Sequence, residues 1–291
     1  MDSDIEDEIL ARTLVRRIEH QHFDPSAVAI NHRYRVDDVH GVVNLSPDGF
    51  TTSRAQNALR GLSSGDTILV PTQREFDVSV AGQLPMGFDP GALYTSRNHP
   101  RGLQMSIYAM SDALADLGLD WDQLAGSLPP DAVSVYVSSS MGQLDEAATG
   151  GMMTAGLRGE RVSAKNCPLG FAEMPGDFLN AYVLKSMGHT GPALGACATF
   201  LYNLQRGVDD IKSGRARIAV VGAAEAPILP ELMDGYVAMG ALATDKELRQ
   251  LQGVGEEGLI HHRSACRPFG DNCGFVMGES AQVMILMDDA L

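Results

Sequence analysis

The sequence predicts an α/β fold. Three patterns predict it: valines alternate with other side chains over residues 132–138, residues 217–222 form an apolar run, and residues 101–117 repeat apolar side chains at helical spacing. Apolar strands that alternate with helices favour layers of helix packed on sheet. The chain of 291 residues can bury a sizeable core, and at roughly 150 residues per domain it holds one large or two small domains.

Residues 1–77 form an N-terminal region of atypical sequence, and residues 78–291 form a second region with more regular patterns. In the first region, apolar side chains over residues 9–18 follow a helical stripe. These side chains are Ile9, Leu10, Leu14, Val15 and Ile18. Residues 67–71 and 76–81 are typical of short extended segments.

In the second region, helices and strands alternate along the chain. The helix predicted at residues 101–117 ends before Gly118, which suits a C-terminal cap. The strand predicted at residues 132–138 leads into a turn of small residues that ends at Gly142. A further helix is expected from residue 178 to residue 187.

The C-terminal part contains the segments that matter most for function. We expect a buried strand or strand edge at residues 191–195, then a helix that begins at Cys197 and ends before Ser213. Its apolar face consists of Phe200, Leu201, Leu204, Val208 and Ile211. Residues 245–262 are expected to form a polar loop, and residues 278–287 a strand.

Charge and composition exclude several functions. Lys plus Arg number 22 and Asp plus Glu number 37, so a formal net charge of −15 argues against nucleic-acid binding and against adhesion to anionic membranes. No apolar run approaches the roughly 18 residues that cross a bilayer, and the acidic start is not a signal peptide. The 4 cysteines are too few for a disulfide scaffold at this length. The sequence therefore predicts a cytoplasmic protein with reduced cysteines.

Cys197 is the strongest candidate for a catalytic residue. It lies between a glycine-containing segment and an apolar helix. A helix N-terminus has unpaired N–H groups and carries about half a positive charge, which stabilises a thiolate and a developing oxyanion. Small neighbours admit a substrate carbonyl, and a buried helix would place the thiol at the base of a pocket. Position alone leaves the alternative of a buried, inert cysteine open.

Three stretches of the chain together resemble β-ketoacyl synthases. Gly191–Thr199, with the sequence Gly-Pro-Ala-Leu-Gly-Ala-Cys-Ala-Thr, is similar to the nucleophile motif of that family, and residues 219–225 follow it as in the family. Residues 267–281 are close to the family's Arg-Pro-Phe-Asp…Asp-Gly-Phe-Val-Met-Gly-Glu-Gly-Ala block. Residues 80–119 and 133–142 resemble the family's first strand-turn and the segment before it.

This resemblance covers roughly residues 78–291 and implies a fold and a reaction. The fold is a thiolase-like α-β-α-β-α layered sandwich, of which the chain would be the first α/β half. The enzyme would be an acyltransferase, a 3-oxoacyl-carrier-protein synthase of fatty-acid or polyketide synthesis that needs no cofactor. In the reaction that the resemblance implies, Cys197 takes an acyl group as a thioester. Malonyl-carrier protein then loses carbon dioxide, and its carbanion attacks that thioester.

The resemblance also implies roles for individual residues. The N–H group of Cys197 would be one of two oxyanion donors. Met141 and Gly142 match positions that line the acyl pocket, and Phe200 would pack near the catalytic turn. Glu279 matches a buried glutamate that supports the family's catalytic network of histidine and lysine.

Implied partners are an acyl carrier protein, acyl and malonyl thioesters, and a second copy of the chain. Family members are homodimers that pair through a strand close to the nucleophile, here residues 192–195. Carrier proteins are acidic, so docking needs a local basic surface. The candidates by charge alone are Arg97, Arg101, Lys212, Arg215 and Arg217, for which an ordinary solvated surface is the alternative.

The sequence departs from the family in the residues that complete the reaction. One catalytic histidine of the family lies in a His-Gly-Thr motif, which does not occur in the 291 residues. The chain therefore resembles the N-terminal half of a synthase. A catalytically incomplete fragment, or a non-catalytic synthase-like partner subunit, is the alternative to an active synthase. His189 is the histidine nearest to Cys197 in sequence, and we expect it to have a surface or packing role.

A zinc site is the remaining possibility that residue types suggest. His261, His262, Cys266 and Cys273 are zinc-ligand types, but their spacing, His-His-x3-Cys-x6-Cys, matches no standard zinc motif. We therefore expect no metal.

Overall fold

The structure is a computed structural model. It describes residues 14–17, 30–35, 67–71, 77–85, 87–155 and 161–291. The chain divides into two compact units. The first combines Met1–Arg17, Asp77–Met152 and Ser163–Leu291, and the second combines Ile18–Phe76 and Met153–Val162. The division at residue 77 that the sequence suggests stays a prediction.

Two pairs of short strands belong to the N-terminal third of the sequence. In the second unit, β2 (Ile30–Arg35) pairs antiparallel with β3 (Thr67–Pro71), where an extended segment is predicted. In the first unit, β1 (Leu14–Arg17) pairs antiparallel with β4 (Val80–Gln83). The helix predicted over residues 9–18 is therefore wrong at Leu14–Arg17, because pairing with another strand overrides a weak local preference. Residues 9–13 and 18 lie outside the described residues.

The first unit is built on a mixed three-stranded sheet in the order β5-β6-β7. β5 (Val133–Ser138) runs parallel to β6 (Ile218–Glu225), and β7 (Ser280–Met287) runs antiparallel to β6. Ile218 stands opposite Val133 on one side and Met287 on the other. All three strands fall where the sequence predicts strands. β5 is buried along its whole length, as expected for a strand that is covered on both faces.

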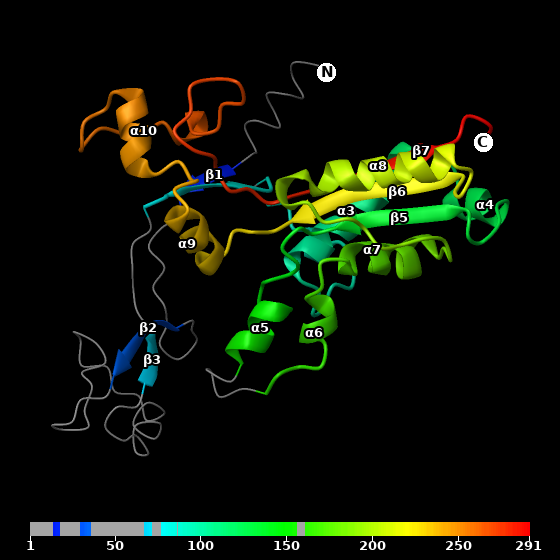
Figure 1. Cartoon of the computed structure of the whole chain (residues 1–291), viewed down its shortest axis with the longest axis horizontal. Coiled ribbons are helices and arrows are strands. Elements are labelled where there is room, and N and C mark those ends of the chain that lie inside the picture. Colours follow the sequence, from blue (N-terminus) through cyan, green and yellow to red (C-terminus); the bar gives the residue numbers. More distant parts are fainter. Residues whose placement is uncertain (1–13, 18–29, 36–66, 72–76, 86, 156–160) are drawn as a thin grey trace. The chain divides into compact units, whose positions relative to one another are not determined.

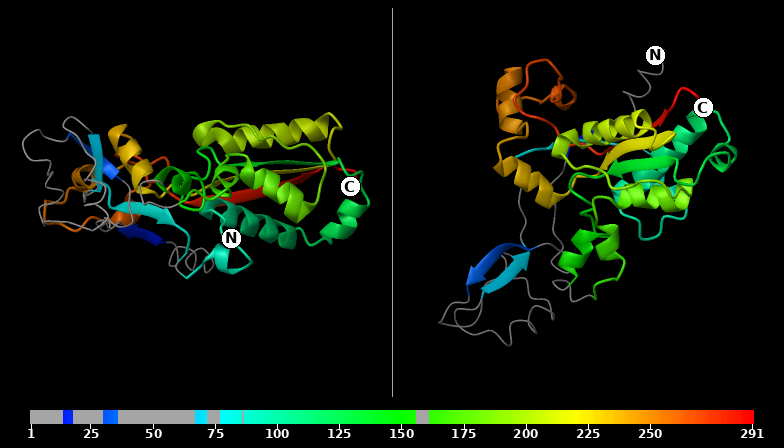
Figure 2. Two further views of the ribbon diagram at one scale, coloured as in Figure 1. Left: turned by 90° about the horizontal axis from the view of Figure 1, so that it is seen from below. Right: turned by 45° about the vertical axis from the view of Figure 1, so that its right-hand side comes forward.

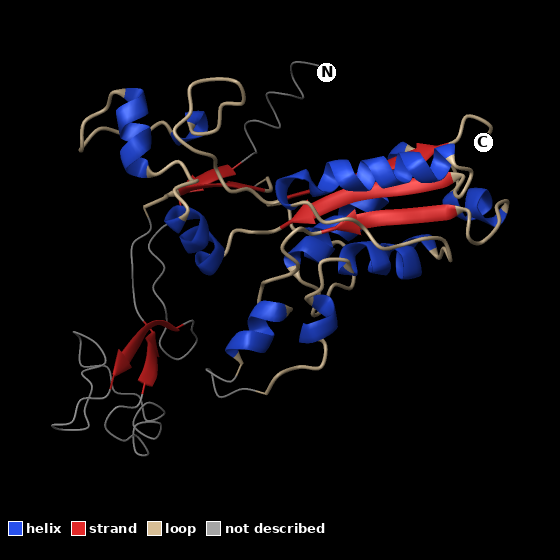
Figure 3. Cartoon of the chain, viewed as in Figure 1, coloured by secondary structure: helices blue, strands red, loops and turns tan. Residues whose placement is uncertain are grey.

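Helices cover both faces of this sheet (Figures 1 and 2). α3 (Arg101–Asp116) and α7 (Met174–Phe178) lie on one face, and α8 (Thr199–Lys212) lies on the other. The core between α3, α7 and the sheet includes Leu103, Ile107, Met110, Val133, Val135, Val137, Leu179, Ile218 and Val220. The result is three layers, helix on sheet on helix (Figure 3), and the predicted α/β class is confirmed.

Helix α8 lies close to the sheet. A Cβ atom at Gly207 would come within 2.5 Å of Val221 Cγ1, which is closer than real Cβ contacts. One turn further on, the buried carboxylate of Asp210 accepts hydrogen bonds from two side chains of β5, Ser134 Oγ at 2.7 Å and Tyr136 OH at 2.5 Å. Arg215 pairs with the same carboxylate. These contacts fix the C-terminal half of α8 against β5 and β6.

Shorter elements complete the described chain. The remaining α-helices are α4 (Trp121–Gly126), α5 (Thr149–Thr154), α6 (Asn166–Leu169), α9 (Pro230–Ala238) and α10 (Asp245–Gln252). A π-helix, Leu179–Leu184, continues α7 and accounts for most of the helix predicted at residues 178–187. Single 3₁₀ turns lie at Pro90–Ala92, Ala196–Ala198 and His262–Ser264. No helix in the described part of the chain is long and apolar enough to cross a membrane.

Helix α10 corrects the polar loop that the sequence predicts at residues 245–262. Thr244 Oγ1 accepts a hydrogen bond from the Glu247 N–H at 3.3 Å, and the Glu247 carboxylate accepts one from the Thr244 N–H at 3.1 Å. This capping box satisfies two backbone donors at the helix start. Gly253, with φ 66°, ends the helix. The Thr-x-x-Glu and Gly signals are visible in the sequence, but only Leu248 is buried, so the helix shows little apolar periodicity.

Candidate active site

The candidate nucleophile lies in a 3₁₀ turn that leads directly into α8. Cys197 is the middle residue of the turn Ala196–Ala198, and its side chain is exposed. The start of α8 lies at the same end of the sheet as the C-terminal ends of β5 and β6 (Figure 1). The predicted helix after Cys197 is confirmed. The prediction that the thiol lies at the base of a pocket is wrong for these residues, because the side chain is in contact with solvent.

The segment before Cys197 is a loop and not the predicted buried strand. Gly191 has φ 98°, which interrupts an extended backbone, and Pro192 has no N–H to offer a neighbouring strand. The Ala193 N–H donates to Asn203 Oδ1 at 2.9 Å instead of to another strand. The chain meets β5 just upstream, where His189 O accepts from the Val135 N–H at 2.8 Å.

Hydrogen bonds hold the backbone on both sides of Cys197. Thr199 Oγ1 accepts from the Gly195 N–H at 3.0 Å and donates to Ala196 O at 2.7 Å. Ala196 has φ 49°, a left-handed conformation that costs a residue with a side chain about 1–2 kcal/mol. Among the described residues, no group accepts a hydrogen bond from the Cys197 N–H. A free donor at this position suits the predicted oxyanion role, which stays a prediction.

The turn after β5 carries two of the predicted acyl-pocket residues, Met141 and Gly142. Glu225, at the end of β6, clamps this turn: its carboxylate accepts from the Ser140 N–H at 2.5 Å, from Ser140 Oγ at 2.6 Å and from Ser139 Oγ at 3.1 Å. Gly142 has φ 75°, and a Cβ there would lie 2.7 Å from a backbone oxygen, so the turn requires glycine. Met141 is 37 % exposed.

One buried side chain connects the Cys197 loop with the strand that ends in this turn. Asn203 of α8 contacts the loop at Ala193 and the last residue of β5, Ser138. Phe200 is half-buried near the start of α8. Sequence reasoning missed both Asn203 and Glu225. Both could have been noticed in the sequence. Glu225 is the last residue of the family-like segment at residues 219–225, and Asn203 is a polar residue within a helix that was predicted to be buried.

Comparison with known proteins assigns the family. The family model described as "Beta-ketoacyl synthase, N-terminal domain" matches residues 87–290, which is more than half of the chain. The chain belongs to the β-ketoacyl synthase family. The resemblance drawn from the nucleophile motif and the block at residues 267–281 is thereby confirmed.

Comparison with two relatives shows how much of a β-ketoacyl synthase's length this chain matches. It is 48% identical over 296 residues to the β-ketoacyl-[acyl-carrier-protein] synthase FabY of Pseudomonas aeruginosa, covering 97% of this chain and 46% of FabY. It is 28% identical over 253 residues to 3-oxoacyl-[acyl-carrier-protein] synthase 2 of Staphylococcus aureus, covering 84% of this chain and 57% of that protein. The chain thus spans about half the length of these curated relatives.

Solved structures confirm the thiolase-like α/β fold. The crystal structure of FabY from P. aeruginosa matches with a TM-score of 0.81 at 44% identity, over 99% of this chain and 47% of that one. A β-ketoacyl synthase from Burkholderia phymatum matches with a TM-score of 0.59 at 21% identity, over 75% of this chain and 50% of that one, and supports the fold alone.

In this synthase chain Glu279 joins the start of β7 to the start of α3. Its carboxylate, 11% exposed, accepts from Arg101 Nη2 at 3.1 Å, Arg101 Nε at 3.2 Å and the Leu84 N–H at 3.0 Å. A guanidinium that contacts both oxygens of a carboxylate forms one of the stronger pairings available to proteins. The contact makes Glu279 a structural clamp, and its predicted support of a catalytic network stays a prediction.

We expect Glu279→Gln to lower the free energy of unfolding by about 1–3 kcal/mol, because the Arg101 guanidinium loses its less exposed charged partner and keeps the more exposed Asp89. Urea unfolding of the 291-residue chain measures the change. Glu257→Gln, at an exposed loop glutamate, is the matched control and should change little. Equal midpoints for both variants would contradict the clamp.

The five basic residues considered for carrier docking differ in their surroundings. Three of them pair with carboxylates: Arg101 with Glu279 and Asp89, Arg215 with Asp210, and Arg217 with Asp288. Arg97 and Lys212 are exposed. A cation already paired within the chain is a weaker docking element than an exposed one, so Arg97 and Lys212 are the better candidates.

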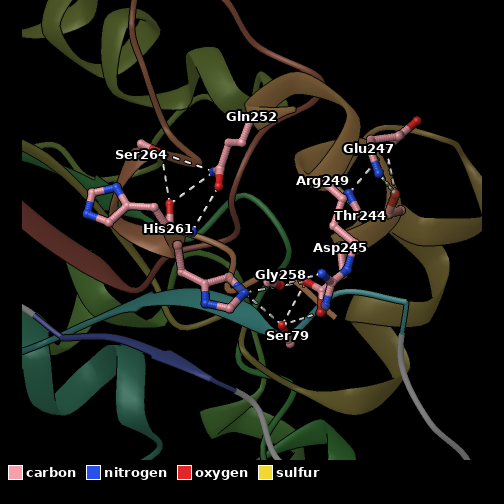
Figure 4. Close-up of polar contacts among 10 residues, drawn as sticks. Ser79, Thr244, Asp245, Glu247, Arg249, Gln252, Gly258, His261 and Ser264 are labelled. Carbon is pink, nitrogen blue, oxygen red and sulfur yellow. Dashed lines mark hydrogen bonds and ion pairs between the residues drawn. The ribbon is translucent and has the colours of Figure 1, made fainter. Parts of the chain in front are cut away.

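The histidines and cysteines of the zinc hypothesis lie around α10. Among the described residues, no three His, Cys, Asp or Glu side chains gather closely enough to hold a metal ion. His262 Nε2 lies 3.2 Å from Ser79 Oγ and 3.7 Å from Asp245 Oδ1. Figure 4 shows Ser79 beside Asp245, to which its hydroxyl donates. His189 is exposed, as a surface role requires.

The contact of Ser79, His262 and Asp245 contains the residue types of a catalytic triad, but its geometry differs. In a triad the two ring nitrogens of histidine face different partners. Here the same nitrogen, Nε2, faces both Ser79 and Asp245, and Ser79 Oγ lies 2.7 and 2.6 Å from the two carboxylate oxygens. The cluster therefore joins the residue before β4, the start of α10 and the 3₁₀ turn at His262–Ser264 as a structural contact.

The loop after α10 has the spacing of a dinucleotide-binding motif without its geometry. Gly253, Gly255 and Gly258 form a Gly-x-Gly-x-x-Gly pattern. Such a loop binds phosphates when it opens a helix, because the N-terminal N–H groups then face the ligand. Here it follows α10, and Arg249 Nη1 donates to Gly255 O at 2.8 Å and to Gly258 O at 2.5 Å. The glycines serve a turn that closes on α10.

Proposed function

We propose that this chain carries the acyl-accepting half of a β-ketoacyl synthase, with Cys197 as the nucleophile. The observation that carries the proposal is the exposed thiol in a 3₁₀ turn at the start of α8, beside a backbone N–H that has no acceptor among the described residues. Membership of the family and 48% identity to FabY support it. The pathway is fatty-acid or polyketide synthesis, and the donor is an acyl thioester of a carrier protein.

The first step is a thioester exchange. The Cys197 thiolate attacks the acyl carbonyl. The developing oxyanion accepts a hydrogen bond from the Cys197 N–H. The intermediate collapses by breaking the bond to the carrier sulfur, which leaves as a thiolate and takes up a proton. The partial positive charge at the start of α8 favours both the attacking thiolate and the oxyanion. Ala196 and Ala198 have small side chains that leave room for the carbonyl, whereas the Tyr202 ring fills the space beside Gly195.

The second step is decarboxylative condensation. Malonyl-carrier protein loses carbon dioxide, and the resulting carbanion attacks the thioester carbonyl on Cys197. A carbon–carbon bond forms, and the Cys197 thiolate leaves. We propose this step for the whole synthase. The alternative is that these 291 residues perform acylation alone, as a catalytically incomplete fragment or as a partner subunit, because no His-Gly-Thr motif occurs among them.

The proposal extends to the residues around the thiol and to the partners. Met141, Gly142 and Phe200 line the acyl chain, and Glu279 supports the catalytic network. An acidic carrier protein docks on basic surface such as Arg97 and Lys212. The name of FabY, β-ketoacyl-[acyl-carrier-protein] synthase, includes an acyl carrier protein, and one solved ketosynthase of the same fold is in complex with its acyl carrier protein. A cytoplasmic homodimer is part of the proposal.

The experiment combines acyl-carrier protein with the chain and maps the adduct by mass spectrometry. We expect a single acyl group on Cys197. Malonyl-carrier protein is then added, and the 3-oxoacyl product is measured. Release of product supports the complete reaction, and an adduct that persists without product supports the incomplete fragment. Absence of an adduct on Cys197 in a folded chain would contradict the proposal.

A further inference from the structure

The most deeply buried line of residues on α8, which lies against the sheet, is mostly polar. Its buried residues are Thr199, Asn203, Gly207 and Asp210, which recur at helical spacing along one side. Of the predicted apolar face, Leu204 and Ile211 pack beside β6, whereas Leu201 is 61% exposed. Burying polar side chains costs free energy unless each finds hydrogen-bond partners. The partners of this line of residues therefore indicate what the helix must hold in place.

Asn203 has the most complete set of partners on this line. Its side chain is fully buried, and its amide uses both donors and its carbonyl. Nδ2 donates to Ser138 Oγ and to Gly222 O, each at 3.0 Å, and Oδ1 accepts from the Ala193 N–H at 2.9 Å. An amide is the side chain that supplies two donors and an acceptor from one planar group.

These three bonds reach three different segments. Ser138 is the last residue of β5 and precedes the turn of Met141 and Gly142. Gly222 lies in β6, and Ala193 lies in the loop four residues before Cys197. Asn203 is thus a direct side-chain link from the loop before Cys197 to the last residue of β5 and to the interior of β6.

The backbone near the thiol needs such a link. Ala196 holds a left-handed φ of 49°, and a conformation of this kind persists when its surroundings determine it. Thr199 fixes the turn locally through Gly195 and Ala196. Those bonds stay within the turn and its first helical residue. Asn203 adds the bond that places the turn relative to the sheet.

We propose that Asn203 is a positioning residue for acyl transfer to Cys197. It holds the nucleophile loop in register with the turn after β5, so that the thiolate and an acyl chain bound at that turn face each other. This role rests on the proposed function of Cys197 as acyl acceptor. Asn203 touches neither substrate nor thiol, and it acts through the backbone at Ala193 and the end of β5.

Two variants of Asn203 separate positioning from folding. Asn203→Leu has a similar size and removes all three bonds. Asn203→Asp keeps an acceptor for the Ala193 N–H and for the Ser138 hydroxyl, but places a carboxylate oxygen against Gly222 O. Both variants lower stability. We expect kcat for acyl transfer, per folded molecule, to fall roughly 10- to 100-fold in Asn203→Leu and about threefold or less in Asn203→Asp, with KM for acyl-carrier protein unchanged.

Ser134→Ala is the matched control. Ser134 is a buried hydroxyl on the same strand as Ser138, but it bonds Asp210 at the other end of α8. This variant should lower stability without changing kcat per folded molecule. The folded fraction of every variant is taken from circular dichroism under the assay conditions.

The outcomes distinguish this inference from the proposed function. Unchanged kcat in folded Asn203→Leu, or equal losses in the Leu and Asp variants in proportion to stability, would overturn the positioning role while Cys197 remains the acyl acceptor. A wild-type chain that takes up no acyl group from acyl-carrier protein would overturn the proposed function and this role together. A large loss in Leu with retention in Asp supports it.

Discussion

Replacing Cys197 by alanine is expected to abolish acyl transfer, with a loss of about 10³-fold or more in the rate of adduct formation. The reason is that, in the part of the chain that the structure describes, residues 196–203 at the start of α8 contain no second cysteine to act as the covalent acceptor. The side chain is exposed and the fold does not depend on its packing, so stability should change by less than about 0.5 kcal/mol. The measurement is intact-protein mass after incubation with acyl-carrier protein.

The chain offers two matched controls for this experiment. Cys167 and Cys266 are also exposed thiols, and neither lies in a turn that leads directly into a long helix. Cys167→Ala and Cys266→Ala should leave adduct formation unchanged. If acyl groups appear on Cys167 or Cys266 as readily as on Cys197, exposure alone explains the reaction, and the start of α8 has no special role.

The central sheet and its longest helix were predictable because local pattern and tertiary structure agree there. Val133, Val135 and Val137 alternate in sequence and are buried in β5, and α3 buries its predicted apolar positions. The failures at residues 14–17 and 191–195 share a cause, whereas α10 was missed although its capping signals stand in the sequence. Leu14–Arg17 is a strand because β4 lies beside it, and residues 191–195 form a loop because Asn203, ten residues beyond Ala193, takes the N–H of Ala193. In both segments a partner outside the segment takes part in deciding the structure.

The candidate site was predictable in part for the same reason. Cys197 could be found from its place between glycines and a helix, and the family-like motifs supported it. Of the apolar face predicted for the helix after it, Leu204 and Ile211 pack against the core, as expected, whereas Leu201 is exposed. Sequence reasoning missed the fully buried line beside that face, because polar residues suggest solvent. This line consists of Thr199, Asn203, Gly207 and Asp210. Their polar groups are compensated by strands far away in sequence, and no periodicity within α8 reveals those partners.

Asp210 is the other polar anchor of α8, and we expect Asp210→Ala to lower the free energy of unfolding by about 3–5 kcal/mol. The variant leaves the buried hydroxyl of Ser134 without an acceptor, deprives Tyr136 of its partner, and removes the negative charge that pairs with Arg215. Asp209→Ala is the matched control, because Asp209 is the neighbouring acid of the same helix and is exposed. Its effect should stay within about 0.5 kcal/mol.

The pH dependence of unfolding tests the same contact with the sign fixed in advance. Burial alone would raise the pKa of Asp210, but hydrogen bonds from Tyr136, Ser134 and Arg215 together outweigh burial and lower this pKa below its ordinary value of 3.8. A lowered pKa in the folded state contributes stability that is present above the unfolded pKa and is lost as pH falls through the folded pKa. We therefore expect the wild-type chain to lose more stability than Asp210→Asn as the pH falls from about 5 through the lowered pKa of Asp210. Parallel curves for the two proteins would mean that the charge of Asp210 does not hold α8 on the sheet.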